Sequence, residues 1–170
     1  MTNWPIVSFV LMVSVSGAGC AVFYQRPPSA LSDAAWRGDL DTVRQLVKNG
    51  ADINELNGAA LSLAARGGHP LGPHTCGAEP AGRAAEIEAL LELGANPNQR
   101  DGRPRSIGGS SGWTPLFVAL HHKQFQSAIV LLNHGADPTL KSDQGMTVME
   151  MAEVEGAPKE VTDLIRHKIK

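Results

Sequence analysis

The chain has 170 residues, 42% hydrophobic and 19% charged, which suits one globular domain with a buried core. A formal net charge of −2 and a sequence pI of about 6.3 give no electrostatic basis for binding nucleic acid, which requires a concentrated basic patch. Aromatic side chains make up only 5% of the chain, too few for a platform on which bases stack. The two cysteines, Cys20 and Cys76, form no disulfide framework.

The N-terminal segment has the pattern of a secretory signal. No charged side chain occurs before Arg26, and residues 6–15 are an apolar run followed by small residues. The order Ala18-Gly19-Cys20 resembles the lipobox of bacterial lipoproteins, in which the cysteine receives a diacylglycerol and becomes the new N-terminus after cleavage. The resemblance implies a signal peptide over residues 1–19, a lipid on Cys20 and a tether over residues 20–28.

Two other interpretations of this segment stay open. Gly17 stands where the lipoprotein family has an aliphatic residue, and residues 1–5 contain no Lys or Arg. A simple cleaved signal is one alternative. The other is an uncleaved anchor, because residues 6–24 are uncharged and nearly match the roughly 20 residues that span a bilayer. We expect a lipid-anchored domain in the periplasm of a bacterial cell envelope; with an uncleaved anchor, the repeats would lie in the cytoplasm.

The stretch 112–141 predicts a helix, a turn, a second helix and a hairpin. Thr114 is placed as an N-cap whose side chain accepts from the first turn, and Pro115 follows at the first helical position. The second helix is predicted over residues 125–133 from its apolar spacing. Gly135 is placed to end that helix in the left-handed conformation.

The sequence Thr-Pro-Leu-Phe-Val-Ala at 114–119 resembles the ankyrin-repeat signature Thr-Pro-Leu-His-x-Ala, which opens a 33-residue unit. Weaker copies begin near residues 29, 59 and 147. The resemblance implies an all-α ankyrin solenoid of about four repeats over residues 29–170, with atypical repeats capping both ends. The spacing predicts a shortened first hairpin, an insert over residues 70–83 before a helix over 84–94, and a second insert within 101–112. In the last repeat we expect one apolar stripe of Val161, Leu164, Ile165 and Ile169.

The ankyrin resemblance implies a concave protein-binding surface with no reactive groups, so we expect another protein as the partner, no cofactor and no enzymatic activity. Trp and Arg are enriched at interface hot spots. The candidate partner-binding residues predicted to be exposed on this surface are Trp36, Arg37, Arg66, Arg100, Arg103, Trp113, His121 and His122. The alternative for the two tryptophans is that they cover the edge of the stack.

Three residues of the first insert raise the alternative of a metal-handling envelope protein. His69, His74 and Cys76 are ligand types that suit zinc or copper, but their spacing matches no closed ligand set. We therefore expect no metal site. Glu86 and its neighbouring glutamates lie along one helix without an acid or base partner, so no catalytic group is expected.

Taken together, the sequence predicts a membrane-tethered protein-protein interaction module. By analogy with other envelope repeat proteins, an inhibitor, immunity or protective role toward an envelope protein is one expectation. Long loops often carry function, so the two inserts are expected to influence partner choice.

Overall fold

The computed structural model describes residues 29–67, 80–101 and 112–170. The predicted signal peptide and tether, with Cys20, lie outside these ranges. The helices of the described residues are α1 (Ala30–Arg37), α2 (Leu40–Lys48), α3 (Glu55–Ala65), α4 (Pro80–Glu92), α5 (Pro115–His121), α6 (Phe125–Asn133), α7 (Val148–Val154) and α8 (Lys159–Ile169). None of these helices is long and apolar enough to cross a membrane.

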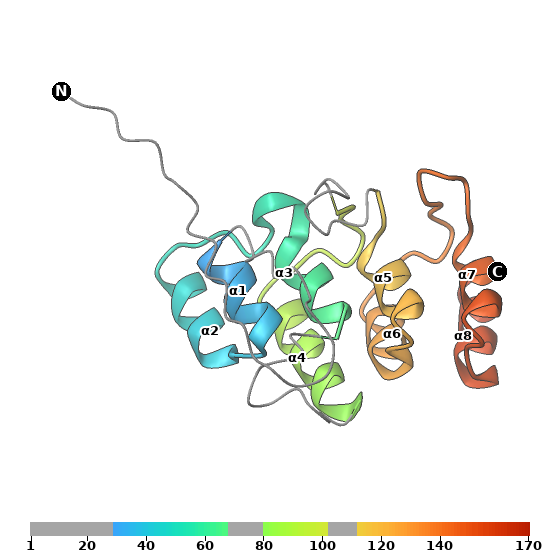
Figure 1. The fold of residues 1–170 in the computed structure, drawn as a ribbon, viewed down its shortest axis with the longest axis horizontal. Coiled ribbons are helices and arrows are strands. Elements are labelled where there is room, and N and C mark those ends of the chain that lie inside the picture. The colour runs from blue at the N-terminus through green and yellow to red at the C-terminus, as the bar shows by residue number, and fades with distance from the viewer. Residues whose placement is uncertain (1–28, 68–79, 102–111) are drawn as a thin grey trace, which may run out of the picture.

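The helices form a stack of antiparallel pairs that runs along the long axis of the molecule (Figure 1). The first helices of successive pairs, α1, α3, α5 and α7, pack on one another in order, and α4, α6 and α8 form a second layer against them. One continuous hydrophobic core runs between the layers. Its largest fully buried side chains include Leu31, Leu61, Ile87, Leu90, Leu116, Phe117, Leu131 and Ile165. The predicted all-α solenoid of helix pairs is therefore confirmed.

Several predicted elements agree closely with the structure. The helix predicted over residues 125–133 is α6, and Pro115 is the first residue of α5. Gly135 has the left-handed φ of 89° that was expected at the end of α6. Only residues 49–54 separate α2 from α3, as the shortened first hairpin predicted.

The N-cap of α5 differs from the prediction, and α7 has a capping box that was not predicted. Thr114 is the N-cap residue of α5, but its side chain makes no capping hydrogen bond. The residue is only 1% exposed, so packing rather than capping sets its rotamer. Thr147 of the last repeat makes the full capping box with Glu150, because the glutamate three residues later can return the bond.

The helices around the predicted insert and at the C-terminus also need correction. α4 begins at Pro80, four residues before the predicted start, because proline is compatible with a first helical position. In α8, Val161 and Ile165 are buried as predicted, but Ile169 is 48% exposed. α8 has 11 residues and α7 only 7, so the last turn of α8 extends past its packing partner.

An asparagine ties the first repeat to the second at the loops that follow their second helices. The side-chain amide of Asn54 donates to the carbonyl of Gly94 at 3.1 Å, and its oxygen accepts from the backbone N–H of Asn96 at 2.7 Å. One side chain thus satisfies two backbone groups of the next repeat, in a loop where they have no helical partner.

The same device joins the second repeat to the third. Asn98 donates to the carbonyl of Gly135 at 3.0 Å and accepts from the N–H of Asp137 at 2.7 Å. At the equivalent place in the third repeat stands Thr139, whose hydroxyl and N–H both bond Asp137 within their own turn. We call this pair of hydrogen bonds, from one asparagine side chain to two backbone groups of the next repeat, the asparagine clamp. It is present at the first two joints, which are the contacts between repeats one and two and between repeats two and three.

We expect Asn98→Ala to lower the free energy of unfolding by about 1 to 2 kcal/mol, because it removes two hydrogen bonds across a joint. Urea denaturation of the variant and the wild type measures this difference. Thr139→Ala is the control at the equivalent position and should cost less, because its bonds remain inside one turn. Equal losses of unfolding free energy in the two variants would contradict the conclusion that Asn98 stabilises the contact between repeats.

Candidate functional site

The third repeat presents a cluster of rings at the ends of its first helix. The rings of Trp113 and His121 make an edge-to-face contact with centroids 5.0 Å apart, and His121 makes a similar contact with His122 at 5.2 Å. Trp113 also lies 6.3 Å from the buried ring of Phe117, which fixes its inner edge to the core. Three of the candidate partner-binding residues therefore lie together, and each keeps part of its surface exposed.

This cluster also connects the third repeat to the fourth. Nδ1 of His121 lies 2.9 Å from Oε1 of Glu155, the C-cap residue of α7. The contact holds the imidazole between Trp113 and the last repeat. The cluster therefore contributes both to the contact between the third and fourth repeats and to the exposed surface.

Arg66, another candidate, belongs to the same region. The pKa of His122 is lowered to about 4, first by burial and then by the positive charges of Arg66 and His121, while Glu155 acts in the opposite direction. His122 is therefore neutral at neutral pH. Arg66 is exposed at the end of α3 and provides positive charge beside it.

The remaining candidates have other surroundings. Nη1 of Arg100 donates to the carbonyl of Gly112 at 2.9 Å and lies 3.3 Å from Oδ1 of Asp143, so this guanidinium connects the two ends of the second insert to the last hairpin. Arg37 is exposed and makes a 2.9 Å ion pair with Asp33, while Trp36 is half-buried. Both residues lie at the C-terminal end of α1, two repeats away from Trp113. Arg103 lies outside the described residues.

The predicted metal candidates His69, His74 and Cys76 lie outside the described residues. Within the described ranges, no group of three or more His, Cys, Asp or Glu side chains could hold a metal ion.

A buried ion pair was missed by the sequence analysis. Nη1 of Arg83 lies 2.8 Å from Oε2 of Glu86, and both side chains are about 5% exposed. From the sequence, only an acid or base partner for Glu86 was considered, and Arg83 was not considered as an ion-pair partner. The i,i+3 spacing would have indicated the pair, but residues 80–83 were assigned to the insert rather than to α4.

This pair is packed against the turn between α1 and α2. A Cβ on Gly38 would lie 3.4 Å from Oε2 of Glu86 and 3.8 Å from Nη1 of Arg83, so the pair connects the second repeat to the first. Oε1 of Glu86 and Nη2 of Arg83 are buried without hydrogen-bond partners. Burial raises the pKa of Glu86 to about 7, although the guanidinium of Arg83 favours the charged carboxylate. Perturbed groups often mark functional sites, but this one lies inside a repeat joint and serves packing.

The fold and its surface define a class of helical-repeat proteins that bind through the exposed face of a stack. The family model "Ankyrin repeats (3 copies)" matches residues 31–142. The chain therefore belongs to the ankyrin-repeat family, whose members are interaction modules with protein partners.

Two curated relatives show how far the similarity extends. A protein of Treponema pallidum (strain Nichols) described as ankyrin-repeat-containing is 27% identical over 143 residues, which is 84% of this chain and 42% of that protein. Human 2-5A-dependent ribonuclease is 36% identical over 73 residues, which is 43% of this chain and 9% of the ribonuclease. The chain thus spans less than half the length of either relative.

We expect Glu86→Gln to change how stability depends on pH. Between pH 4.5 and about 7 the unfolded chain releases the proton of Glu86 while the folded chain keeps it, so the wild-type free energy of unfolding falls as pH rises. The variant lacks this titration, so its free energy of unfolding minus that of the wild type should rise by the order of 3 kcal/mol between pH 4.5 and about pH 7, whatever the offset caused by removing the partner of Arg83. Urea denaturation across this range measures it. The exposed Glu88→Gln is the control; a Glu86→Gln profile parallel to the wild type would contradict the assignment.

His122 should make the free energy of unfolding depend on pH in the opposite direction. Its folded pKa of about 4 lies below the unfolded value of 6.5, so stability falls as pH drops through this window, where only the unfolded chain takes the proton. In the Glu86→Gln variant, this loss of stability as pH falls should become visible. Adding His122→Gln should remove it. An unchanged acid slope in the double variant would show that His122 does not cause it.

Proposed function

We propose that this chain is an ankyrin-repeat interaction module that is held at a bacterial membrane by a lipid on Cys20 and binds another protein. The binding surface in this proposal is the first-helix face, defined as the surface over α5 and α7 with the end of α3. The observation that carries the proposal is the ordered, partly exposed cluster of Trp113, His121 and His122 beside Arg66.

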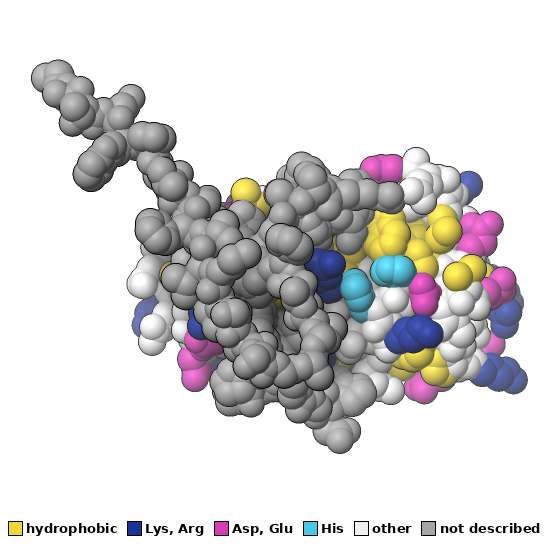
Figure 2. Space-filling view, in the orientation of Figure 1, with side chains coloured by type: hydrophobic (Ala, Val, Ile, Leu, Met, Phe, Trp, Pro, Cys, Tyr) yellow, Lys and Arg dark blue, Asp and Glu magenta, His cyan; other side chains and the backbone are white. Residues whose placement is uncertain are grey.

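The composition of this face favours a protein partner. Figure 2 shows histidine and apolar side chains in the region of α5 and α7, with basic and acidic side chains around them. Partly buried Trp113 and Met149 contribute apolar surface that is packed against the core. Tryptophan and arginine are enriched at hot spots, and methionine adapts to irregular partner surfaces. The contacts of Trp113 with His121 hold its ring in place before binding, which lowers the entropy lost in the complex.

The tether would raise the affinity that such a surface achieves. A lipid on Cys20 confines the domain to a membrane, so a partner at the same membrane experiences a high effective concentration. The proposed location is the bacterial cell envelope, with the repeats in the periplasm. Under the alternative of an uncleaved anchor, the repeats and their partner would be cytoplasmic.

The proposed biological role is that of an inhibitor, immunity or protective partner of an envelope protein. An interaction module without catalytic groups acts by covering or holding its partner, and tethering keeps it near an envelope target. The similarity to a ribonuclease covers 9% of that enzyme and leads to no proposal of catalysis.

The tether is tested by mass spectrometry of the N-terminus in membrane fractions, with wild type beside Cys20→Ala. The proposal predicts a diacylated Cys20 as the first residue, with loss of the modification and of cleavage in the variant. An intact Met1 in a chain that remains in the membrane would contradict lipidation and move the search for partners to the cytoplasm.

A further inference from the structure

The α1–α2 pair is held to the stack by less apolar packing than its equivalent in the third repeat. In α2 only Val43 is buried, whereas α6 buries Leu131 and Leu132 as well as smaller side chains. Within the described helices, α4 packs on α6 and α6 packs on α8, but α2 makes no comparable contact with α4. A segment with few buried apolar contacts opens at a lower free energy than the rest of a fold. The first repeat, at one end of the stack, is such a segment (Figure 1).

The contact of α1 with α3 adds only limited apolar area to this packing. The buried apolar side chains of α1 are Leu31 and the two alanines Ala34 and Ala35. An alanine buries much less apolar area than a leucine, so it contributes less stabilisation. The clamp of Asn54 fixes the chain at the start of α3, after both helices of the first repeat. The unit that can open is therefore α1 with α2, and its hinge is residues 49–53.

A buried polar contact holds the α1–α2 pair in addition to this packing. At Gly38, the turn between α1 and α2 lies against the ion pair of Arg83 and Glu86, whose side chains are each 5% exposed. The two side chains make one 2.8 Å contact, and Oε1 of Glu86 and Nη2 of Arg83 have no hydrogen-bond partner. Desolvation offsets much of the attraction within a buried ion pair when polar atoms of the pair stay unsatisfied. Opening of α1 and α2 would return both groups to water.

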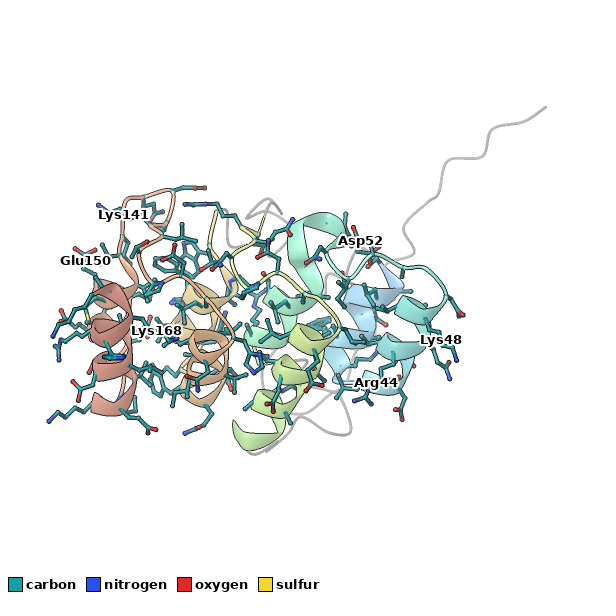
Figure 3. The ribbon with its side chains drawn as sticks, turned by 180° about the vertical axis from the view of Figure 1, so that it is seen from behind. Arg44, Lys48, Asp52, Lys141, Glu150 and Lys168 are labelled. Atoms are coloured by element: carbon teal, nitrogen blue, oxygen red, sulfur yellow. The ribbon has the colours of Figure 1, made fainter. Side chains whose placement is uncertain are left out.

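Arg83 is the charged group that acts on the carboxyl of Glu86. Burial raises the pKa of Glu86 from 4.5 to about 7, and the positive charge and hydrogen bond of Arg83 oppose this rise. On α2, Asp41, Arg44 and Lys48 are exposed, and Figure 3 shows the last two. The other charged or titratable groups on or next to α1, α3, α4 and α6, none of which is a cause of this shift, are Asp33, Arg37, Asp39, Glu55, Arg66, Glu88, Glu92, Lys123 and His134.

We infer that the buried Arg83–Glu86 pair is a proton-controlled latch that holds the first repeat, α1 with α2, against the second. While Glu86 carries its proton, the closed joint buries a neutral carboxyl. Once the proton is lost, the buried carboxylate favours water and the joint opens more often. The inference concerns the joint itself and holds whether or not Cys20 is lipidated. In a tethered chain, an open first repeat would extend the reach of the binding surface from the membrane.

The sign of the pH dependence follows from the two states of the joint. In the open joint Glu86 is in water with its ordinary pKa of 4.5, and in the closed joint its pKa is about 7. Opening therefore releases a proton between these values. The opening constant should rise by up to about tenfold per pH unit in this range and level off above pH 7. His122 lies in the third repeat, so its titration should not affect this opening.

The test is hydrogen–deuterium exchange of the full chain in detergent, read by mass spectrometry of peptic fragments and corrected for intrinsic exchange rates. Between about pH 5 and pH 7.5, amides of α1 and α2 should exchange through an opening that is more frequent than that of α5 and α6. Its dependence on urea should be weaker than that of global unfolding, because less surface is exposed. Its opening constant should rise with pH by about tenfold or more.

Matched variants assign the latch to the pair. Glu86→Gln should remove the pH dependence of the α1–α2 opening, whereas Glu88→Gln, which removes an exposed carboxyl from the same helix, should keep it. The double variant Arg83→Met with Glu86→Leu replaces the partly satisfied pair by apolar side chains. It should also remove the pH dependence and should lower the opening constant at pH 7.5 by about tenfold. This variant keeps the test valid if Glu86→Gln alone does not fold.

Three results would overturn the inference. The first is equal protection and equal urea dependence in α1–α2 and α5–α6, because the first repeat would then open only with the whole fold. The second is an opening of α1 and α2 that does not change with pH in the wild type. The third is a pH dependence that persists in the variants that lack the carboxyl of Glu86.

Discussion

A helix pair of this kind buries only part of its apolar surface, and the rest must be covered by the next pair in the stack. The fold therefore depends on the joints between repeats. The first two joints carry the asparagine clamps of Asn54 and Asn98, which satisfy backbone groups of the following repeat. The last joint has Thr139 in place of the asparagine, and there His121 contacts Glu155 across α5 and α7. Part of the candidate binding cluster thus also stabilises the stack.

This double role explains the arrangement of the candidate site. α1, α3, α5 and α7 pack on one another in one layer, and the turns after α3 and α5 are in contact, because the side chain of Gln124 lies over Gly67. Residues far apart in the sequence, such as Gly67 and Gln124, become neighbours through this repetition. The core needs only the apolar positions, so it does not determine the exposed turn residues. Lys123 has a φ of 57° at one of these turns, a conformation that is less favourable for lysine than for glycine.

The sequence was sufficient for the fold because each repeat carries local signals. Pro115 and Gly135 mark one helix start and one helix end, and both behave as predicted. The start of α4 was missed because Gly82 and Pro80 weaken a helical pattern, although proline suits the first turn. Arg83 was consequently left in an insert, and its pairing with Glu86 was missed. The contacts of Trp113, His121 and His122 depend on tertiary packing, which the order of residues along the chain does not show.

The central claim is that the first-helix face binds a protein while the opposite layer does not. The most direct test places a photo-cross-linking amino acid at His121 or at Lys168 of α8, which Figure 3 shows on the opposite layer, in cells that express the full chain. The account predicts a discrete cross-linked protein from His121 and none from Lys168. Cross-links of equal yield from both positions, or from Lys168 alone, would contradict it.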